Sequence, residues 1–489
     1  MKRIYKITQV ALFGAFIVGC TDLDTAPLSS TITADQKEDV VAADPSKIEA
    51  SVTAITANFT QYAKIYTEDD NVHSDIGYPT IMLATDSRTT DFVADITGYN
   101  WYSNSANYSD CLSTSTATIE FWGTLYNQIY TANAVIGTVD NETSDPTLQF
   151  YLAQALAIRA FDYFTLVQLY QFNYKGHEDA PGVPIITSEN AEEVAANGCA
   201  RSTVKETYEF ILGDLNKAIE LLANTKKTRS DKRYVSLDVA YGIRARVHLT
   251  MHNYADALKD AEAALASTSS VPYSSAAVSK PTFIDIEDAS WMWGILITDK
   301  DRVSTTGICN FPSHMGSLNY GYASVGGWRR ISPKLYNQIP ESDVRKGWFL
   351  DDTGVSVNLP AAAQAYITKK GAPVYTQVKY GPMNDEWGSN NNATDVILMR
   401  VEEMYLIKAE AQAMNNDVSG GVNTLNSFVN TYRDPSYKCT ATTGEAVQEA
   451  VWHQRRIEFW GEGLAYFDIM RLNKGVNRLG IGFPKNCGI

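Results

Sequence analysis

Cysteine is scarce in this sequence, and its spacing excludes the common zinc sites. The 489 residues contain six cysteines and no C-x-x-C pair, so the usual zinc-ligand spacing is missing. One cysteine, Cys20, ends the first apolar segment. The others are Cys111, Cys199, Cys309, Cys439 and Cys487. Because five is an odd number, at least one of these is free or pairs between chains. The sequence therefore predicts no disulfide scaffold and no zinc site.

Positive charge is also scarce. The chain carries 41 Lys and Arg against 56 Asp and Glu, which gives a net charge of −15 at pH 7, and no basic block is longer than a pair. An acidic chain without a basic patch repels phosphate backbones, so we expect no nucleic-acid partner. Hydrophobic residues make up 45% of the chain, which excludes disorder and allows a large core.

Long apolar runs are missing as well, since a bilayer span needs about 20 residues. A shorter run from Ile7 to Gly19 follows three cations and ends at Cys20, an order typical of a secretory signal. Phe16–Cys20 resembles a bacterial lipobox, in which the cysteine receives a diacylglycerol and the chain is cut before it. The resemblance predicts a signal peptide at residues 1–19, lipidation of Cys20 and a flexible tether at residues 20–35.

What the sequence does contain is helical periodicity in two regions, approximately 120–265 and 396–475. The predicted helices are 151–170, 204–222, 237–252, 254–265, 396–414, 420–432 and 445–461. Thr203 and Glu206 have the spacing of a capping box. Residues 237–265 resemble a tetratricopeptide unit, with a turn at Met251–Asn253. Residues 405–429 resemble a second copy, with its turn at Gly420–Gly421. Such units bury their faces by stacking.

Two further regions, approximately 66–118 and 268–395, have weak periodicity and are rich in Ser, Thr, Gly, Asn, Tyr and Trp. This composition predicts loops and short strands. Large irregular insertions in a helical array are uncommon unless they are functional. Trp291 and Trp293 flank Met292 in an apolar stretch, which predicts a buried strand.

Catalytic motifs are missing. We find no G-x-S-x-G, P-loop or G-x-G-x-x-G. His248 and His252 are four residues apart, but the glutamate of H-E-x-x-H is missing between them, so we expect structural roles. Carboxylate pairs are present at Asp69-Asp70, Asp351-Asp352, Glu402-Glu403 and Glu458/Glu462. Glu458 and Glu462 are spaced one helical turn apart, close to Arg455, Arg456 and Arg471, which predicts a structural ion-pair network rather than a hydrolase centre.

Aromatic residues point to binding instead. A flat ring covers the apolar C–H face of a sugar, and Asp, Asn or Arg binds the hydroxyls at its edge. Two segments, 78–104 and 319–330, combine these residue types. The candidate ligand contacts are Tyr78, Asp86, Arg88, Asn100, Trp101, Tyr102, Asn104, Tyr320, Tyr322 and Trp328.

Six segments resemble, in the same order, motifs of the SusD/RagB family of outer-membrane nutrient-binding lipoproteins. They are Leu23–Pro27, Trp122–Asn133, Leu156–Tyr170 with the following Gly182–Pro184, Arg201–Leu222, Arg400–Ala411 and Arg455–Arg471. Gln454 and Phe459-Trp460 depart from the family pattern. The resemblance spans nearly the whole chain.

The resemblance implies one mostly helical domain, residues 36–489, in which a tetratricopeptide-like scaffold carries a large irregular ligand-binding region. It also implies a lipid anchor in the outer membrane facing the cell exterior, a SusC-like TonB-dependent barrel as partner, and no catalysis. Family ligands are glycans in many cases and peptides in others. The family's ligand-binding loop falls near residues 78–104, which makes Trp101 the main candidate.

Two alternatives to glycan capture remain open in the sequence. One is RagB-like binding of oligopeptides. The other is a lipid-anchored assembly factor that uses its helical repeats to bind another protein. We expect no cofactor, and scattered Asp and Asn residues leave a structural calcium ion open.

Overall fold

A computed structural model describes residues 34–62, 72–95, 97–305, 307–480 and 482–483. The chain divides into two units, residues 1–47 and 48–489. In the first unit, the described residues form α1 (Ala34–Ala43) and most of a 3₁₀ turn, η1 (Pro45–Ile48). The predicted signal peptide, Cys20 and residues 20–33 of the predicted tether lie outside the described residues, and α1 begins within the last two tether residues.

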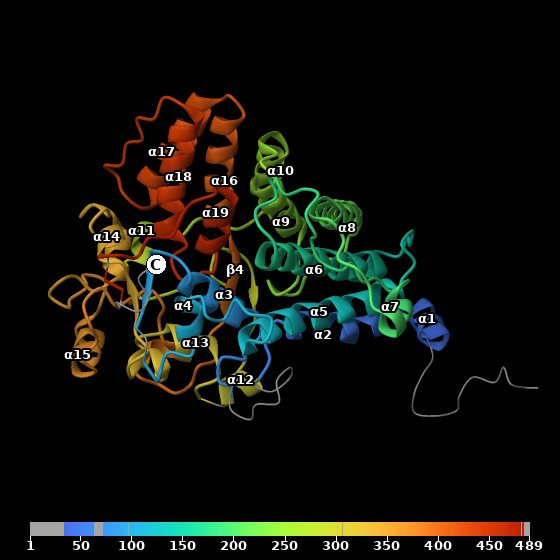
Figure 1. Ribbon diagram of the computed structural model, residues 1–489, viewed down its shortest axis with the longest axis horizontal. Helices are drawn as coiled ribbons and strands as arrows, with labels where there is room; N and C mark the ends of the chain where they lie inside the picture. The colour runs from blue at the N-terminus through green and yellow to red at the C-terminus, as the bar shows by residue number, and fades with distance from the viewer. Residues whose placement is uncertain (1–33, 63–71, 96, 306, 481, 484–489) are drawn as a thin grey trace, which may run out of the picture. The chain divides into compact units, whose positions relative to one another are not determined.

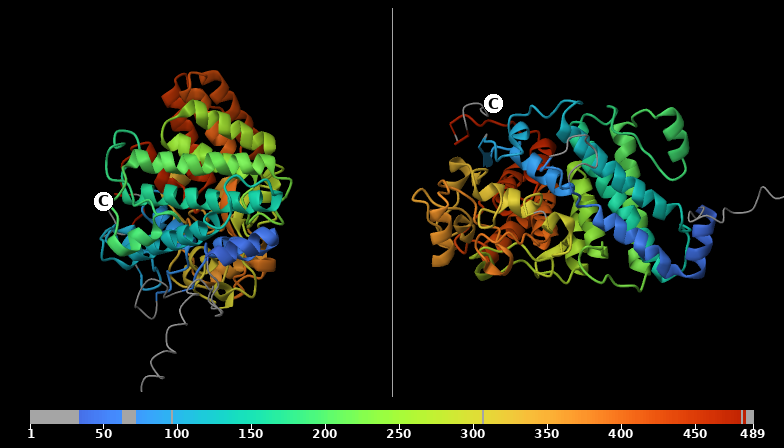
Figure 2. Two further views of the ribbon diagram at one scale, coloured as in Figure 1. Left: turned by 90° about the vertical axis from the view of Figure 1, so that its right-hand side faces the viewer. Right: turned by 90° about the horizontal axis from the view of Figure 1, so that it is seen from below.

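The second unit is built on stacked helices. The first set is α2 (Glu49–Ala57), α5 (Thr116–Ile136), α6 (Pro146–Tyr170), α8 (Val204–Asn224), α9 (Leu237–Thr250) and α10 (Tyr254–Ser267). From α5 to α10 each of these helices packs against the next, and α10 then packs against α16 (Figure 1). The left view of Figure 2 shows the same helices lying in successive layers. The predicted tetratricopeptide pair α9–α10 and its turn at Met251–Asn253 are confirmed.

Helix α6 is the central element of the stack. Its residues from Phe150 to Gln168 are all buried, so it has no polar face, and several of them are small alanines that allow neighbouring helices to approach closely. It begins at Asp145, whose carboxylate accepts hydrogen bonds from the backbone N–H groups of Thr147 and Leu148. The predicted capping box of α8 is confirmed, because Thr203 and Glu206 each accept a hydrogen bond from the backbone N–H group of the other.

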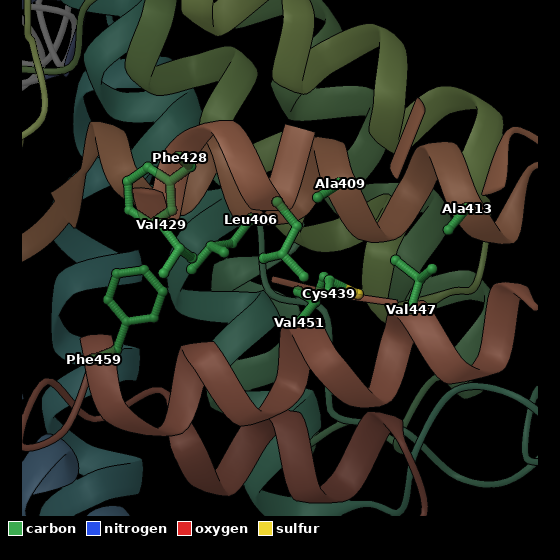
Figure 3. Close-up of a cluster of buried hydrophobic side chains, with 10 residues drawn as sticks. Leu406, Ala409, Ala413, Phe428, Val429, Cys439, Val447, Val451 and Phe459 are labelled. Carbon is green, nitrogen blue, oxygen red and sulfur yellow. The ribbon is translucent and has the colours of Figure 1, made fainter. Parts of the chain in front are cut away.

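The C-terminal helices are α16 (Val401–Met414), α17 (Val418–Tyr432), α18 (Gly444–Glu458) and α19 (Ala465–Arg471). Leu406 of α16, Phe428 of α17 and Val451 of α18 meet in one buried cluster (Figure 3). The prediction of a turn at Gly420–Gly421 was wrong, because both residues lie inside α17 and the connection is Asn415–Asp417. A Cβ on Gly421 would lie 2.6 Å from the Ala409 carbonyl oxygen, so this glycine permits helix contact rather than a turn.

Two short sheets connect distant parts of the chain. β2 (Trp291–Ile295) pairs antiparallel with β4 (Val396–Arg400). The predicted buried strand at Trp291–Trp293 is confirmed. The prediction of a helix from Val396 was wrong, since its first five residues form β4. All five are buried, so an alternating pattern is missing, and such a run cannot be distinguished from a buried helix by periodicity. β1 (Phe92–Ala94) pairs with β3 (Arg329–Ile331).

The regions predicted as irregular also contain helices. The longest in the first region is α3 (Tyr78–Ser87), whose ten residues are all buried, which explains its weak periodicity. The remaining elements are α4 (Ser103–Ala106), α7 (Ala191–Asn197), α11 (Ser275–Val278), α12 (Arg302–Thr305), α13 (Phe311–Met315), η2 (Tyr322–Ser324), α14 (Pro333–Tyr336), η3 (Val344–Trp348), α15 (Ala361–Lys369) and η4 (Met383–Asp385). As predicted, the fold is mostly helical with few short strands. None of the described helices is long and apolar enough to cross a membrane.

Candidate functional site

The two segments predicted to bind ligand lie side by side. In the β1–β3 pair, Ala94 is opposite Arg329, which joins residues 78–104 to residues 319–330. Beyond the strands, the Thr97 hydroxyl donates to the Gly326 carbonyl oxygen over 3.3 Å. The Arg329 guanidinium donates to the side-chain oxygen of Asn100 over 2.7 Å. The two segments therefore meet in one part of the fold.

An aromatic cluster of His73, Trp101, His314 and Tyr322 forms at this junction. The Trp101 ring stacks on His73 with centroids 4.8 Å apart and approaches the edge of Tyr322 at 6.1 Å. The Tyr322 hydroxyl is hydrogen-bonded to His73 Nδ1, and its ring stacks on His314 at 5.0 Å. Trp101 and Tyr322 are half-buried, so the cluster is held by the fold and still presents aromatic surface.

Below the surface, His314 holds the cluster in place. Its Nε2 donates to the His73 carbonyl oxygen over 2.9 Å, and the Tyr102 ring packs edge-on against it at 5.3 Å. Burial lowers the pKa of His314 to about 3, so the ring is neutral near pH 7. Burial also raises the pKa of Tyr102. Both groups therefore stay uncharged and act as rigid support.

Glycine lets the two loops approach each other. A Cβ on Gly327 would lie 2.8 Å from the Tyr99 carbonyl oxygen and 3.0 Å from that of Tyr322. A Cβ on Gly326, whose φ is +142°, would lie 2.8 Å from the Tyr99 ring. Side chains at either position would separate the loops. On these same two segments the side chain of Tyr99 is 51% exposed and that of Tyr320 is 46% exposed.

The ten predicted contacts divide into two groups. Trp101, Asn104, Tyr320 and Tyr322 reach the surface at least in part. The other six are buried: Tyr78, Asp86, Arg88, Asn100, Tyr102 and Trp328. Buried side chains touch protein rather than solvent, so in this structure these six support the surface instead of presenting it.

Each buried member has a defined structural partner. Arg88 forms an ion pair with Asp110 at 3.1 Å, and Trp328 packs in a hydrophobic cluster with Leu318 and other residues. Asp86 accepts a hydrogen bond from the Gly463 N–H over 2.9 Å, and burial raises its pKa to about 8. Tyr99, His73 and His314 were missed by sequence reasoning. Tyr99 lies within the first segment, whereas no local pattern marks the two histidines.

Most of the carboxylates considered for hydrolysis form ion pairs or hydrogen bonds within the fold. The exceptions are Asp352, which is exposed, and Asp69-Asp70, which lies outside the described residues. Glu458 and Glu462 are buried and form ion pairs with Arg400 at 3.0 and 2.8 Å. The predicted ion-pair network exists, but the prediction of its arginines was wrong, because Arg455, Arg456 and Arg471 pair instead with Asp468, Asp91 and Glu410. Its cations come from distant segments: Arg345, Lys379, Arg400 and Arg433.

Three of the four remaining carboxylates are also engaged. Glu402 pairs with Arg433 and Glu403 with Arg246, and Asp351 caps a turn through Thr353 and Val355. Within the described ranges, no group of three or more His, Cys, Asp or Glu side chains is arranged to hold a metal ion.

Stacked helical pairs define this protein as a tetratricopeptide-like scaffold, and its loops carry an aromatic surface. Residues 35–249 match a family model described as "Starch-binding associating with outer membrane", and residues 339–481 match the model of the SusD family. The chain belongs to the SusD/RagB family.

Individual relatives agree with this assignment. SusD-like protein P2 of Formosa agariphila is 25% identical over 392 residues, which cover 73% of this chain and 72% of that protein. A SusD-like carbohydrate binding protein from Bacteroides vulgatus superposes with a TM-score of 0.73 at 24% identity, over 88% of this chain and 84% of the other. Surface glycan-binding protein A from Bacteroides thetaiotaomicron, in complex with laminarihexaose, superposes with a TM-score of 0.60 at 19% identity, over 88% and 90%.

Proposed function

We propose that this protein captures oligosaccharides at the cell surface and passes them to a SusC-like TonB-dependent outer-membrane transporter. The observation that carries the proposal is the aromatic cluster, with Trp101 and Tyr322 half-exposed where the two loops meet. Flat rings cover sugar C–H faces, and nearby hydroxyl, amide and imidazole groups can hydrogen-bond the edges. The family description and the glycan complex of a structural relative support this choice of ligand.

The protein is proposed to bind its ligand without catalysis and to be anchored through lipid at Cys20, facing the cell exterior. Membership of a family described as associating with the outer membrane supports this location. A lipid anchor suits a chain whose role is to hold ligand close to a transporter, because proximity raises the effective concentration without requiring high affinity.

The test uses the unlipidated mature chain, residues 20–489 with Cys20→Ser, against a panel of polysaccharides and peptide digests. Binding is read from retarded migration in native affinity gels and from calorimetry. We expect one glycan class to bind and Trp101→Ala to weaken that binding about tenfold or more, since it removes an aromatic platform. Trp122→Ala is the matched control, because Trp122 is 36% exposed on α5 and lies outside the cluster.

Each other result assigns a different function. If Trp101→Ala binds the glycan as tightly as the parent chain, the aromatic cluster is not the capture site. If only peptides bind, the RagB-like alternative replaces glycan capture. If nothing binds and the protein co-purifies from membranes with another protein but no transporter, the assembly-factor alternative replaces it.

A further inference from the structure

A polar cavity of about 460 Å³ lies among α14, η3 and residues 351–358, and it shares no lining residue with the aromatic cluster. Its size falls within the range of about 300–1,000 Å³ that is typical of small-molecule sites. Neither the family comparison nor the proposed capture at Trp101 uses it.

One wall of the cavity is a pair of tyrosines. The rings of Tyr336 and Tyr375 lie 5.0 Å apart at 57°. The backbone of Tyr375 is held on both sides, since its N–H donates to the Leu350 carbonyl oxygen and its own carbonyl oxygen accepts from the Ile331 N–H. Neither phenol hydroxyl has a hydrogen-bond partner among the described residues. Tyr336 is buried, with Lys346 Nζ 5.1 Å from its ring centroid, whereas Tyr375 is half-buried. The Tyr375 ring therefore offers the apolar face, and the pair offers two available hydroxyls.

The acidic residues of the lining give the cavity excess negative charge. Glu341 is paired with Lys346 and Asp343 with Arg345, each at 2.6 Å, so these charges compensate. Asp351 and Asp352 have no cationic partner in the described structure.

The Asp351 carboxylate stays ionised near neutral pH. Partial burial raises the pKa of Asp351, but hydrogen bonds from Thr353 and Val355 hold it below its ordinary value. Asp352 is exposed to solvent. The amide of Asn337, whose side chain forms no hydrogen bond with another described residue, completes the polar lining.

We propose that this cavity is a second saccharide subsite that takes a sugar unit bearing a protonated amine. The tyrosine wall covers the C–H face of the ring, Asn337 and the phenol hydroxyls bind ring hydroxyls, and Asp351 and Asp352 bind the ammonium group through charge-assisted hydrogen bonds. Uronic or sulfated sugars are repelled by the same carboxylates. This inference rests on the proposed capture of glycans and adds a class of sugar to it.

The experiment compares three probes by calorimetry on the unlipidated mature chain: a glucosamine hexamer, an N-acetylglucosamine hexamer and a galacturonic acid hexamer. We expect the glucosamine hexamer to bind most tightly and the galacturonic acid hexamer not to bind. Asp352→Asn should weaken glucosamine binding about tenfold, because it removes one charge-assisted contact. Asp179→Asn, a change at another exposed aspartate, should leave the affinity unchanged.

Tyr336→Leu should weaken glucosamine binding about fivefold. Because Tyr336 is nearly buried, the exposed Asp352 position remains the deciding one. Trp101→Ala should leave glucosamine binding within about twofold of the parent chain. The inference is overturned if the glucosamine hexamer does not bind, if Asp352→Asn binds it as the parent chain does, or if Trp101→Ala abolishes its binding.

These outcomes separate the two proposals. If neutral glycans bind through Trp101 and the glucosamine hexamer does not bind, the second subsite fails and glycan capture stands. If the glucosamine hexamer binds through Asp352 and Trp101→Ala changes no glycan affinity, the second subsite stands and capture at the aromatic cluster fails.

Discussion

At the scale of single residues, Glu120 shows how a buried carboxyl makes stability depend on pH. It lies inside α5, and its Oε1 has no hydrogen-bond partner among the described residues. Burial raises its pKa to about 9, and the nearby Asp75 adds to the shift. Asp75 is itself bound by Gln61, whose amide donates to it over 2.6 Å. In the folded protein Glu120 therefore keeps its proton at pH values well above 4.5, which is the ordinary pKa of a glutamate.

Replacing Glu120 with Gln should make the protein less sensitive to alkali. The unfolded chain loses this proton near pH 4.5 and the folded chain near pH 9. Stability from the group is therefore complete below pH 4.5 and is lost as the pH rises towards 9. For each protein, urea unfolding gives the free energy of unfolding at pH 5 and at pH 8. We expect the decrease between these two pH values to be smaller by ~2 kcal/mol in Glu120→Gln than in the parent chain. Glu189→Gln, at an exposed site, is the control, and equal losses in both variants would contradict the assignment.

At the scale of elements, close helix contact decides where glycine is required. Gly421 sits where α17 crosses α16, and an added Cβ would lie 2.6 Å from the Ala409 carbonyl oxygen and 2.8 Å from the Ala413 Cβ. Gly213 lies inside α8, where an added Cβ would meet nothing within 4 Å. Glycine thus permits close packing at Gly421, whereas at the exposed Gly213 position it only weakens the helix.

Alanine at these two glycines should change stability in opposite directions. Gly421→Ala forces α16 and α17 apart and should lower the free energy of unfolding by ~1–3 kcal/mol. Gly213→Ala should raise it by ~0.5–1 kcal/mol, since alanine is the better helix former and nothing obstructs its methyl group. Thermal unfolding followed by circular dichroism checks both. A shift of equal sign in the two variants would disprove the packing argument.

The elements also show what the sequence could predict. The capping box of α8 and the α9–α10 pair depend on neighbours in sequence, and both were predicted. α3 and β4 are buried on every side, so neither displays the alternation that identifies an element. The same limit applies to the site: composition located both loops, but it could not separate the half-exposed Trp101 from the buried Trp328. That difference depends on contacts made only after folding.

At the scale of the whole molecule, a buried ion-pair network ties distant segments together. Three arginines contact the Glu458 carboxylate of α18 at 2.8 to 3.2 Å. They are Arg345 of η3, Arg400 of β4 and Arg433, which follows α17. Burial raises the pKa of Glu458, but these cations hold it well below its ordinary value. The four cations of the network face four carboxylates, Asp343, Glu402, Glu458 and Glu462, so the interior charge is balanced.

Removing one charge from this network should be costly. Glu458→Gln leaves three guanidinium groups short of a partner and should lower the free energy of unfolding by ~3–5 kcal/mol. Because the Glu458 pKa is depressed, the stability that it contributes is present above its ordinary pKa and is lost as the pH falls, so the deficit should shrink on acidification. Urea unfolding measures both effects.

A surface pair provides the control for this experiment. Lys217→Met removes the exposed contacts of Lys217 with Glu142 and Glu220 and should change stability by less than ~1 kcal/mol. If Lys217→Met and Glu458→Gln lowered the free energy of unfolding by similar amounts, burial of the network would add nothing to stability.

The pairing of β1 with β3 has a consequence for the order of events during synthesis. His73 and Tyr322 touch across 249 positions of sequence, and contacts of such long range close late because the intervening chain must first be ordered. A chain made from its N-terminus cannot assemble the aromatic cluster until the residues of β3 have emerged. Fragments that end before β3 should therefore bind no ligand at the aromatic cluster. Ligand binding there requires a chain in which β3 is already present.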